Sequence, residues 1–485
     1  MSLLSALSNA RSSLATVSAQ TALVSRNIGN AQNTAATRKY ANLSAGAAGG
    51  VQVVSIAQSQ NHALFQSMTS ATGGLAAANA MSDSLTSIQN VVGDVDATTT
   101  PSNTLTALQA ALSQYAVSPE DPQTARAAID AAKDVVNSLN NATKAVQSAR
   151  KDADDQLTAA ASDMNDILSQ FQALNDGIVK GTATGSDVTD LVDQRDQLVT
   201  KLSGYVGVNV QVRSGNDMVL TTDSGITLFE TTARSVEFTP QTAYDATVTG
   251  SPFKIDGVSV SGANSAMPIK SGSVYGLLTF RDETAVTYQG QLDQIASTLV
   301  DDFSESGTYN AQTGSFDPAT GTSASPIQKF QGLFNVALGS TVGAAGSISV
   351  DPAFDNDPTL LRDGQTVDYN TTNSSGFTGR LNQLISAFST QRSFDGSLGA
   401  GSQGSIISYA GSSTAWLQAQ RSAAKDDIDY QSTLLSGTKS ALSDKTGVNL
   451  DEEMTNLLDL ERSYQASSKI ISTIGNMVDS LLNIR

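Results

Sequence analysis

The 485-residue sequence contains no cysteine and a single histidine, His62. Disulfide bonds, iron–sulfur clusters, thiolate zinc sites and cysteine nucleophiles are therefore excluded, as is any metal site built from several histidines. Aromatic residues make up only 5% of the chain, so large side chains that form a dense core are scarce. There is no apolar run of about 18 residues, and we expect no insertion into a membrane.

The N-terminus also lacks the features of a secretory signal peptide. Its first twenty residues show no basic start, no apolar stretch and no small-residue cleavage site. If the protein leaves the cell, we expect a different export route.

Negative charge is missing from the first 82 residues, where the only strong bases are Arg11, Arg26, Arg38 and Lys39. The whole chain has a net charge of −18, and such an acidic surface repels phosphate backbones, so we expect no nucleic-acid partner. A nearly uncharged N-terminal arm indicates a surface that packs against copies of itself or against a partner. The alternative is a helical arm folded onto its own domain.

Near the N-terminus, apolar residues recur at alternating steps of four and three. This heptad pattern predicts a coiled-coil helix over about residues 2–28, roughly 40 Å long. The stripe is narrow and includes small residues, so the helix needs a partner to be stable. The stripe residues that we expect at an assembly interface are Leu3, Leu7, Leu14, Val17, Val24 and Ile28.

The C-terminal segment from Asn449 carries a second helical stripe. Asn449 is suited to cap the helix, and the three acidic residues that follow Leu450 suit the positive end of its dipole. We hypothesise that the two terminal stripes pack on each other, within and between copies, although two unrelated amphipathic helices remain an alternative. The interface residues expected here are Met454, Leu457, Tyr464, Ile471, Val478 and Leu482.

Between the two ends, helical periodicity alternates with short strand-like runs. The predicted fold class is α+β, mainly α: a long helical rod closed by terminal coiled-coil helices, with inserted β-rich domains. We expect residues 1–40 and 446–485 to form a terminal coiled-coil domain, and residues 41–204, 277–302 and 378–445 to form the rod. Residues 205–276 and 303–377 are expected to be β-rich insertions, since alternation at Val206–Val212 is typical of a strand.

Motifs of known chemistry give no enzyme signal. A metalloprotease HExxH motif needs two histidines, and no P-loop sequence is present. The glycine pattern at Gly399–Gly404 follows a flexible Gly/Ser stretch instead of a strand. Ser148, Ser422 and Ser436 each begin an SxxK pattern, but no SDN motif accompanies them. We therefore expect no catalytic residues, no metal site and no cofactor.

Three sequence blocks support a family resemblance. They are the DLxDQRDxL pattern at Asp190–Leu198, the GLLTFRD block at Gly276–Asp282 continued by residues 288–299, and the terminal helix from Val448 through Tyr464 to Asn483. On these blocks the chain resembles the family of bacterial flagellar hook-associated protein 1, the first hook–filament junction proteins. One departure is that Asn27-Ile-Gly-Asn30 is not followed by the family's Thr-Pro-Gly-Tyr turn, so the resemblance does not define how the chain leaves the first helix.

The resemblance implies a structural protein that assembles with itself in the zone joining the hook to the filament. It also implies the hook protein, the second junction protein and a flagellar export chaperone as partners, type III export, and an extracellular location in the flagellum. The second junction protein itself and a flagellin are alternatives within the flagellum. Outside it, the alternatives are a secreted adhesin or effector and a hydrolase of the SxxK type.

Overall fold

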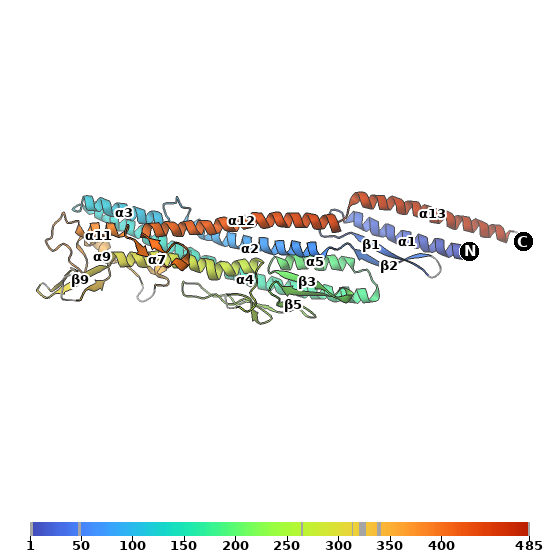
Figure 1. Ribbon diagram of the computed structural model, residues 1–485, viewed down its shortest axis with the longest axis horizontal. Helices are drawn as coiled ribbons and strands as arrows, with labels where there is room; N and C mark the ends of the chain where they lie inside the picture. Colours follow the sequence, from blue (N-terminus) through green and yellow to red (C-terminus); the bar gives the residue numbers. More distant parts are fainter. Residues whose placement is uncertain are drawn as a thin grey trace.

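The computed structural model describes residues 3–46, 50–262, 265–312, 314–319, 326–336 and 341–483. Figure 1 shows an elongated molecule in which long helices run side by side, with small sheets along one flank and at one end. Both chain termini lie at the opposite end. The predicted class, mainly helical with inserted β-rich segments, is confirmed.

The rod consists of long helices, and capping residues or prolines mark where several of them begin. Asn61 and Asp121 cap two of these helices by accepting hydrogen bonds from backbone N–H groups of the first turn. Pro101 and Pro122 occupy first helical positions, where a missing N–H is tolerated. The rod helices are α2 (His62–Val92), α3 (Pro101–Val117), α4 (Pro122–Thr184), α5 (Thr189–Ser203) and α12 (Ile406–Thr446).

The helix α4 spans 63 residues. It continues to Thr184 and ends at Gly185, whose φ of 72° lies in the left-handed region that favours glycine. Its buried face combines alanines with large residues such as Leu157 and Phe171, so neighbouring helices approach closely while each large side chain adds roughly 1.5–3 kcal/mol of burial. Most buried apolar side chains of the rod and insertions form one cluster from Ala80 to Ala424, and Ile178, Val188 and Val192 form a separate small cluster between α4 and α5.

A helical segment in three parts follows the first insertion and packs on the rod. It consists of α6 (Ser273–Thr279), a π-helical turn η2 (Phe280–Thr284) and α7 (Ala285–Phe303), and it contains residues 277–302, which were expected in the rod. Gly276 in α6 rests directly on α2, because a Cβ there would lie 2.4 Å from the backbone oxygen of Ala77. The glycine in the GLLTFRD block therefore permits a close helix–helix approach.

The first β-rich insertion is antiparallel throughout. Its larger sheet has the order β3-β4-β5, formed by β3 (Val208–Val212), β4 (Met218–Thr222) and β5 (Thr227–Phe229). A smaller sheet joins β6 (Val236–Glu237), β7 (Lys254–Ile255) and β8 (Val258–Ser259). The strand predicted from Val206 begins two residues later.

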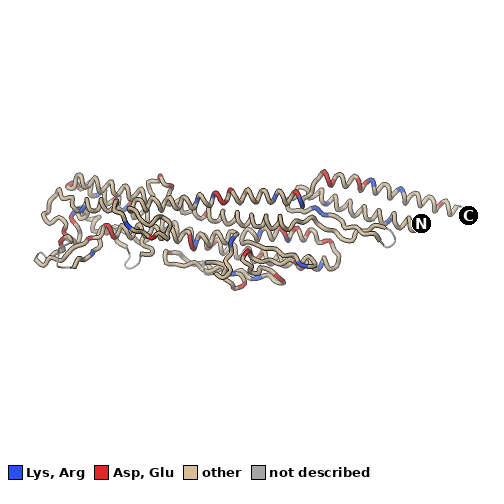
Figure 2. The backbone as a smooth tube through the Cα atoms, viewed as in Figure 1, with Lys and Arg blue, Asp and Glu red and all other residues tan. Residues whose placement is uncertain are grey.

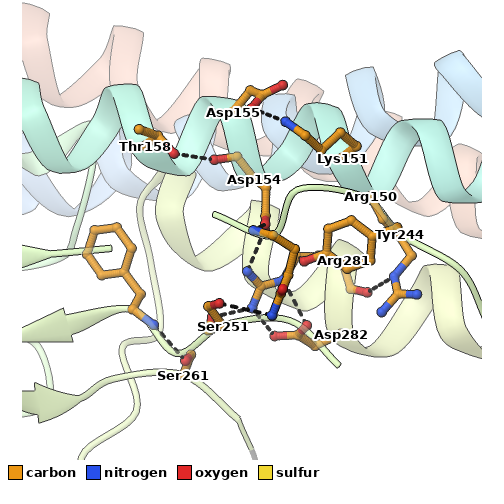
Figure 3. A network of polar contacts seen from close by, with 12 residues as sticks. Arg150, Lys151, Asp154, Asp155, Thr158, Tyr244, Ser251, Ser261, Arg281 and Asp282 are labelled. Atoms are coloured by element: carbon orange, nitrogen blue, oxygen red, sulfur yellow. Dashed lines mark hydrogen bonds and ion pairs between the residues drawn. The ribbon is translucent and has the colours of Figure 1, made fainter. Parts of the chain in front are cut away.

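A buried polar network attaches this insertion to α4 (Figure 3). Arg281 donates from Nη1 to Asp154 Oδ1 at 2.7 Å, and both side chains are completely buried. Tyr244, from the insertion, donates its hydroxyl to the same oxygen at 2.9 Å, while Arg150 stacks over the Tyr244 ring. Arg281 also pairs with Asp282. Buried Asp154 and Arg281 thus pair with each other, while buried Arg150 donates to the backbone oxygens of Asp245, Val248 and Arg281.

The second β-rich insertion lies at the end of the rod farthest from the termini (Figure 1). Buried Glu305 holds it together by accepting hydrogen bonds from three successive backbone N–H groups, those of residues 365–367. Its main sheet has the order β10-β9-β11, from β9 (Glu305–Asn310), β10 (Ser315–Pro318) and β11 (Gln328–Phe330). The remaining elements are β12 (Phe334–Asn335), α8 (Ala344–Ser347), β13 (Ser349–Val350), α9 (Pro352–Asn356) and α10 (Leu360–Asp363). The chain returns to α12 through α11 (Gly379–Ala387), β14 (Arg392–Ser393) and β15 (Gln403–Gly404).

The terminal unit comprises α1 (Leu3–Gly29), a hairpin of β1 (Lys39–Ala45) and β2 (Val51–Gln58), and α13 (Leu450–Leu482). Residues 41–45 and 51–58 were expected in the helical rod, but they form the strands of this antiparallel hairpin. The β-branched residues Val51, Val53 and Ile56 favour strand over helix. Figure 2 shows how few charged residues occur along α1 and the hairpin. The division into domains otherwise stays a prediction, and residues 1, 2, 484 and 485 lie outside the described residues.

Candidate functional site

The helices α1 and α13 lie side by side and run in opposite directions (Figure 1). Val17 and Val24 are buried on α1, while Ser467 and Ile474 are buried on α13. The hydroxyl groups of Ser13 and Ser467 lie 3.1 Å apart across the pair. The first and last segments of the chain therefore close one coiled-coil-like unit, although they are more than 400 residues apart in sequence.

The predicted interface residues of α1 are distributed along this buried side. Val17 and Val24 are buried, and the other four are half-buried: Leu3, Leu7, Leu14 and Ile28. The opposite face of α1 is open and carries mainly small residues, among them Ser8, Ala15, Ser18 and Ala22. Small side chains allow a further helix to approach closely.

On α13, the side that meets α1 is rotated by one residue from the predicted stripe. The observed seam contains Glu453, half-buried Leu460, Ser467 and Ile474. Of the predicted residues, Leu457 and Ile471 lie at the edge of this seam and are half-buried. The exposed ones are Met454, Tyr464 (48% exposed), Val478 and Leu482 (71% exposed).

The exposed face of α13 is consequently rich in large apolar side chains. Within the described residues it includes Leu450, Met454, Leu458, Tyr464, Ile470, Met477, Val478, Leu481 and Leu482. A shallow groove of about 650 Å³ runs between the free ends of the pair, lined by residues such as Leu3, Ile470 and Met477. So many large apolar side chains exposed on one helix indicate an interaction surface.

A buried polar cluster closes the other end of the pair. Asn27 binds the backbone of Lys39 through both atoms of its amide, with Nδ2 donating to the Lys39 oxygen at 2.8 Å and Oδ1 accepting from the Lys39 nitrogen at 3.1 Å. Glu453 accepts from Asn27 Nδ2 at 3.1 Å and from Arg38 Nε at 2.7 Å. This cluster directs the chain out of α1 and into β1, although the Thr-Pro-Gly-Tyr turn is missing.

Acidic residues of α5 hold the terminal unit against the rod. Lys39 Nζ pairs with Asp190 and, at 3.2 Å, with Asp193. Asp193 also accepts from the Thr37 hydroxyl at 2.7 Å. The first two carboxylates of the DLxDQRDxL block, Asp190 and Asp193, thus pair with basic residues of the N-terminal arm.

A second ion pair lies beside this contact. Arg26 Nη1 donates to Asp187 Oδ2 at 2.9 Å. Burial alone would raise the pKa of Asp187, but hydrogen bonds from Thr189 and Arg26 outweigh it and hold that pKa below its ordinary value. Asp187 is therefore a carboxylate at neutral pH and remains paired.

A cavity of about 630 Å³ lies between the terminal unit and the rod. The turn at residues 31–37, the start of α2, α5, and the end of α12 line it. Asp196 faces it, and burial raises the pKa of this carboxyl to about 7, with a smaller contribution from Asp193 and opposition from Arg195.

The single histidine, His62, and the serine and lysine of one SxxK pattern, Ser436 and Lys439, also line this cavity. Among the described residues, no hydrogen bond links Ser436 to Lys439 or His62 to a carboxylate, so they form no nucleophile–base pair. The part of the chain that the structure describes contains no cluster of three potential metal ligands. Within the same residues, none of the helices combines the length and apolar character needed to cross a bilayer.

The polar contacts of Asn27, Lys39 and Glu453 were not predicted from the sequence. Two signals were nevertheless present: the absence of acids from the first 82 residues, and the DLxDQRDxL block that supplies the missing counter-charges. Buried Glu453 was the least expected member, since an acid seldom lies in an apolar seam unless it is paired.

Comparison with known proteins places these features in a family. Residues 85–314 match the model described as "Flagellar hook-associated protein FlgK helical domain", and residues 443–484 match "Flagellar basal body rod FlgEFG protein C-terminal". Flagellar hook-associated protein 1 of Escherichia coli (strain K12) is 25% identical over 489 residues, covering 85% of this chain and 87% of that protein. The Salmonella typhimurium (strain LT2) protein of the same name is 28% identical over 319 residues, covering 63% of this chain and 56% of that protein.

A solved structure shares the fold. It is described as "The structure of the flagellar hook junction protein FlgK from Burkholderia pseudomallei" and matches with a TM-score of 0.55 at 15% identity, covering 78% of this chain and 99% of that chain. The first family model spans most of the rod and the first insertion, the second falls on α13, and the Escherichia coli relative extends over most of the chain. This chain belongs to the family of flagellar hook-associated protein 1.

Proposed function

We propose that this chain is a structural subunit of the zone that joins the hook to the filament of a bacterial flagellum, and that its copies assemble through their terminal units. The proposal rests on family membership and on one observation, the exposed apolar face of α13. In an isolated subunit, side chains such as Met454, Leu458 and Tyr464 keep about half of their surface exposed to water. Burying that remaining half against another copy would contribute roughly 1 kcal/mol for each side chain.

The open face of α1 supports the same arrangement. Its small side chains, together with the shallow groove at the free ends of the pair, allow a helix from a second copy to approach closely. A contact between two different faces is heterologous, and heterologous contacts generate rings or tubes. We propose that the twelve predicted interface residues contribute both within and between copies, with Tyr464 and Val478 acting between them.

Within the flagellum we propose the hook protein and the second junction protein as neighbours on the two sides of this zone. We also propose that a flagellar export chaperone covers α13 before assembly, since its apolar face would otherwise associate nonspecifically. Export through the flagellar type III route would place the protein outside the cell. We infer a purely structural role without catalysis, in keeping with the family.

The first test of this function is the phenotype of cells that lack the gene. We expect electron microscopy to show complete hooks without filaments, and an immunoblot to detect flagellin shed into the medium. Filaments of normal length would contradict the junction role.

Point variants then test the surface. Leu458→Asp places a charge on the exposed face of α13 and should abolish filament attachment while leaving helical content unchanged. Leu457→Asp, at the edge of the seam, should also block assembly. The matched control is Ser468→Asp, which adds the same charge at an exposed polar position of the same helix. Normal attachment of filaments by the Leu458 and Leu457 variants would contradict assembly through α13.

A further inference from the structure

We propose that the terminal unit joins the rod through a polar joint, and that Lys39, held between Asp190 and Asp193, sets the direction in which the α1–α13 pair leaves the rod. The polar joint consists of Arg26, Thr37 and Lys39 on the terminal unit, with Asp187, Asp190 and Asp193 on the rod. The inference rests on the proposed function and deepens it, because it names the residues that position the assembling helices.

The covalent connection between the two parts is slight. The chain passes from β2 to α2 through residues 59–61, and from α12 to α13 through residues 447–449. Ser59 and Arg38 add hydrogen bonds to the end of α12. Ser59 Oγ donates to the backbone oxygen of Lys445 at 3.0 Å, and the backbone N–H of Arg38 donates to the backbone oxygen of Thr446 at 2.7 Å. Two short links of this kind define a position but leave an angle to be set by other contacts.

The hydrophobic core does not extend across the connection. The continuous apolar cluster of the rod runs from Ala80 to Ala424. The buried apolar side chains of the terminal unit lie outside this cluster, namely Ala10, Val17, Leu23, Val24 and Ile474. Parts of a chain that meet through a polar surface are expected to move relative to one another. Rotation at this joint would leave both apolar cores intact.

The cavity at the junction removes the steric barrier as well. A close-packed interface resists rotation because every side chain fills its neighbour's space. Here the turn at residues 31–37, α5 and the end of α12 jointly line a cavity of about 630 Å³. The contact between the terminal unit and the rod is therefore polar and contains a cavity.

Of the polar contacts, the one at Lys39 has the strongest directional effect. Its side chain is 2% exposed and that of Asp193 is 8% exposed, so solvent screens their attraction only weakly. Arg26 and Asp187 are 30% and 27% exposed, and such pairs contribute less. Separating Lys39 from its carboxylates would leave a buried charge without a partner, which is strongly unfavourable. The joint therefore has one preferred angle while Lys39 is paired.

The absence of cysteine allows a direct measurement of this angle. Spin labels attached to the variant Ser169→Cys/Ser472→Cys would report the distance between α4 and α13, since both positions are exposed. In the full-length protein we expect one narrow distance distribution. Adding Lys39→Met keeps the aliphatic stem but removes the charge, and should broaden the distribution at least two-fold or shift its mean. Lys39→Arg should retain the narrow distribution.

The controls separate reorientation from unfolding. Arg213→Gln removes an exposed ion pair with Glu230 in the first insertion and should leave the distribution unchanged. If Lys39→Met loses helical content in circular dichroism, Asp193→Asn decides the question, because it preserves shape and volume. An unchanged, narrow distribution in a fully helical Lys39→Met or Asp193→Asn variant would overturn the inference.

The same variants distinguish this inference from the proposed function. We expect cells that carry Lys39→Met to export the protein but to attach at least ten-fold fewer filaments than the parent strain. Normal attachment by this variant would overturn the positioning role and leave the junction function standing. Normal filaments in cells lacking the gene would overturn the junction function, whereas the distance measurement would be unaffected.

Discussion

The side-chain Nδ2 of Asn27 donates a hydrogen bond to Glu453 Oε2 at 3.1 Å, although the two residues are 426 positions apart in the chain. Glu453 is 1% exposed and carries a negative charge, so its burial is tolerated only because Asn27 and Arg38 satisfy it. This contact joins the two ends of the polypeptide at the base of the terminal helix pair. It also selects which side of α13 faces α1.

We predict that Glu453→Ala weakens the terminal pair by about 1–3 kcal/mol, because Asn27 Nδ2 and Arg38 Nε lose their buried acceptor, although Arg38 keeps its ion pair with exposed Glu452. Hydrogen exchange should show faster exchange of the backbone amides of α1 and α13, with little change in the rod. The matched control is Glu461→Ala, which removes an exposed carboxylate from the same helix and should change protection very little. Equal effects of the two substitutions would show that the buried cluster does not hold the pair together.

The attachment of the first insertion provides a second prediction. Asp154→Asn leaves Arg281 without its fully buried partner and should lower the free energy of unfolding by about 3 kcal/mol. Urea denaturation measures this loss. Asp155→Asn is the control, because that carboxylate is exposed and pairs with Lys151 one helical turn away, so its removal should lower the free energy by less than about 0.5 kcal/mol. A loss below about 1 kcal/mol for Asp154→Asn would contradict the structural role of the network.

Asp196 gives a prediction on pH. Burial raises its pKa in the folded protein to about 7, whereas an unfolded chain has the ordinary value of 3.8. Ionisation at higher pH therefore destabilises the native state, and this destabilisation is complete above pH 7. Asp196→Asn removes it, so the variant should be more stable than the parent at pH 8, on the order of 1 kcal/mol for this partly exposed side chain.

The advantage of Asp196→Asn should shrink as the pH falls from about 7 towards 4, because the native carboxyl of the parent becomes protonated first. Urea denaturation at pH 8, 6 and 4 follows this change. An advantage that stays constant over the range would show that Asp196 titrates normally.

Two glycines offer a matched pair. Gly276→Ala places a methyl group 2.4 Å from the Ala77 backbone oxygen, so α6 must move away from α2, and we expect a loss of about 1–3 kcal/mol. Gly177→Ala lies inside α4, with its nearest neighbour in ordinary contact at 3.6 Å, and should stabilise the protein by about 1 kcal/mol. Thermal unfolding of both variants checks the opposite signs.

Local patterns in the sequence predicted the helices well. The heptad near the N-terminus predicted α1 to within a residue or two, and capping by Asn449 predicted the start of α13. The hairpin was missed even though Val51, Val53 and Ile56 form a β-branched run, because the partner strand at 39–45 has no comparable signal. The predicted α13 stripe differs from the observed seam by one residue, since apolar periodicity gives no weight to a buried acid such as Glu453.

The contacts between distant segments could not be predicted from any local pattern. Lys39 and Asp190 are 151 positions apart, and nothing in either segment alone indicates that they meet. Their charges were visible in the sequence, but the geometry depends on how α4 and α5 fold back to the hairpin. The assembly interface between copies stays a prediction.

The 63 residues of α4 correspond to a length of roughly 95 Å. This single uninterrupted helix begins beside the second insertion and ends beside the polar joint, so its length sets the distance between the two (Figure 1). Adding or removing seven residues, two helical turns, would shift that spacing by about 10 Å while nearly preserving the helix's facing side. In an assembly of many copies, the length of one helix thus defines how far the outlying sheet stands from the contacts made by the chain ends.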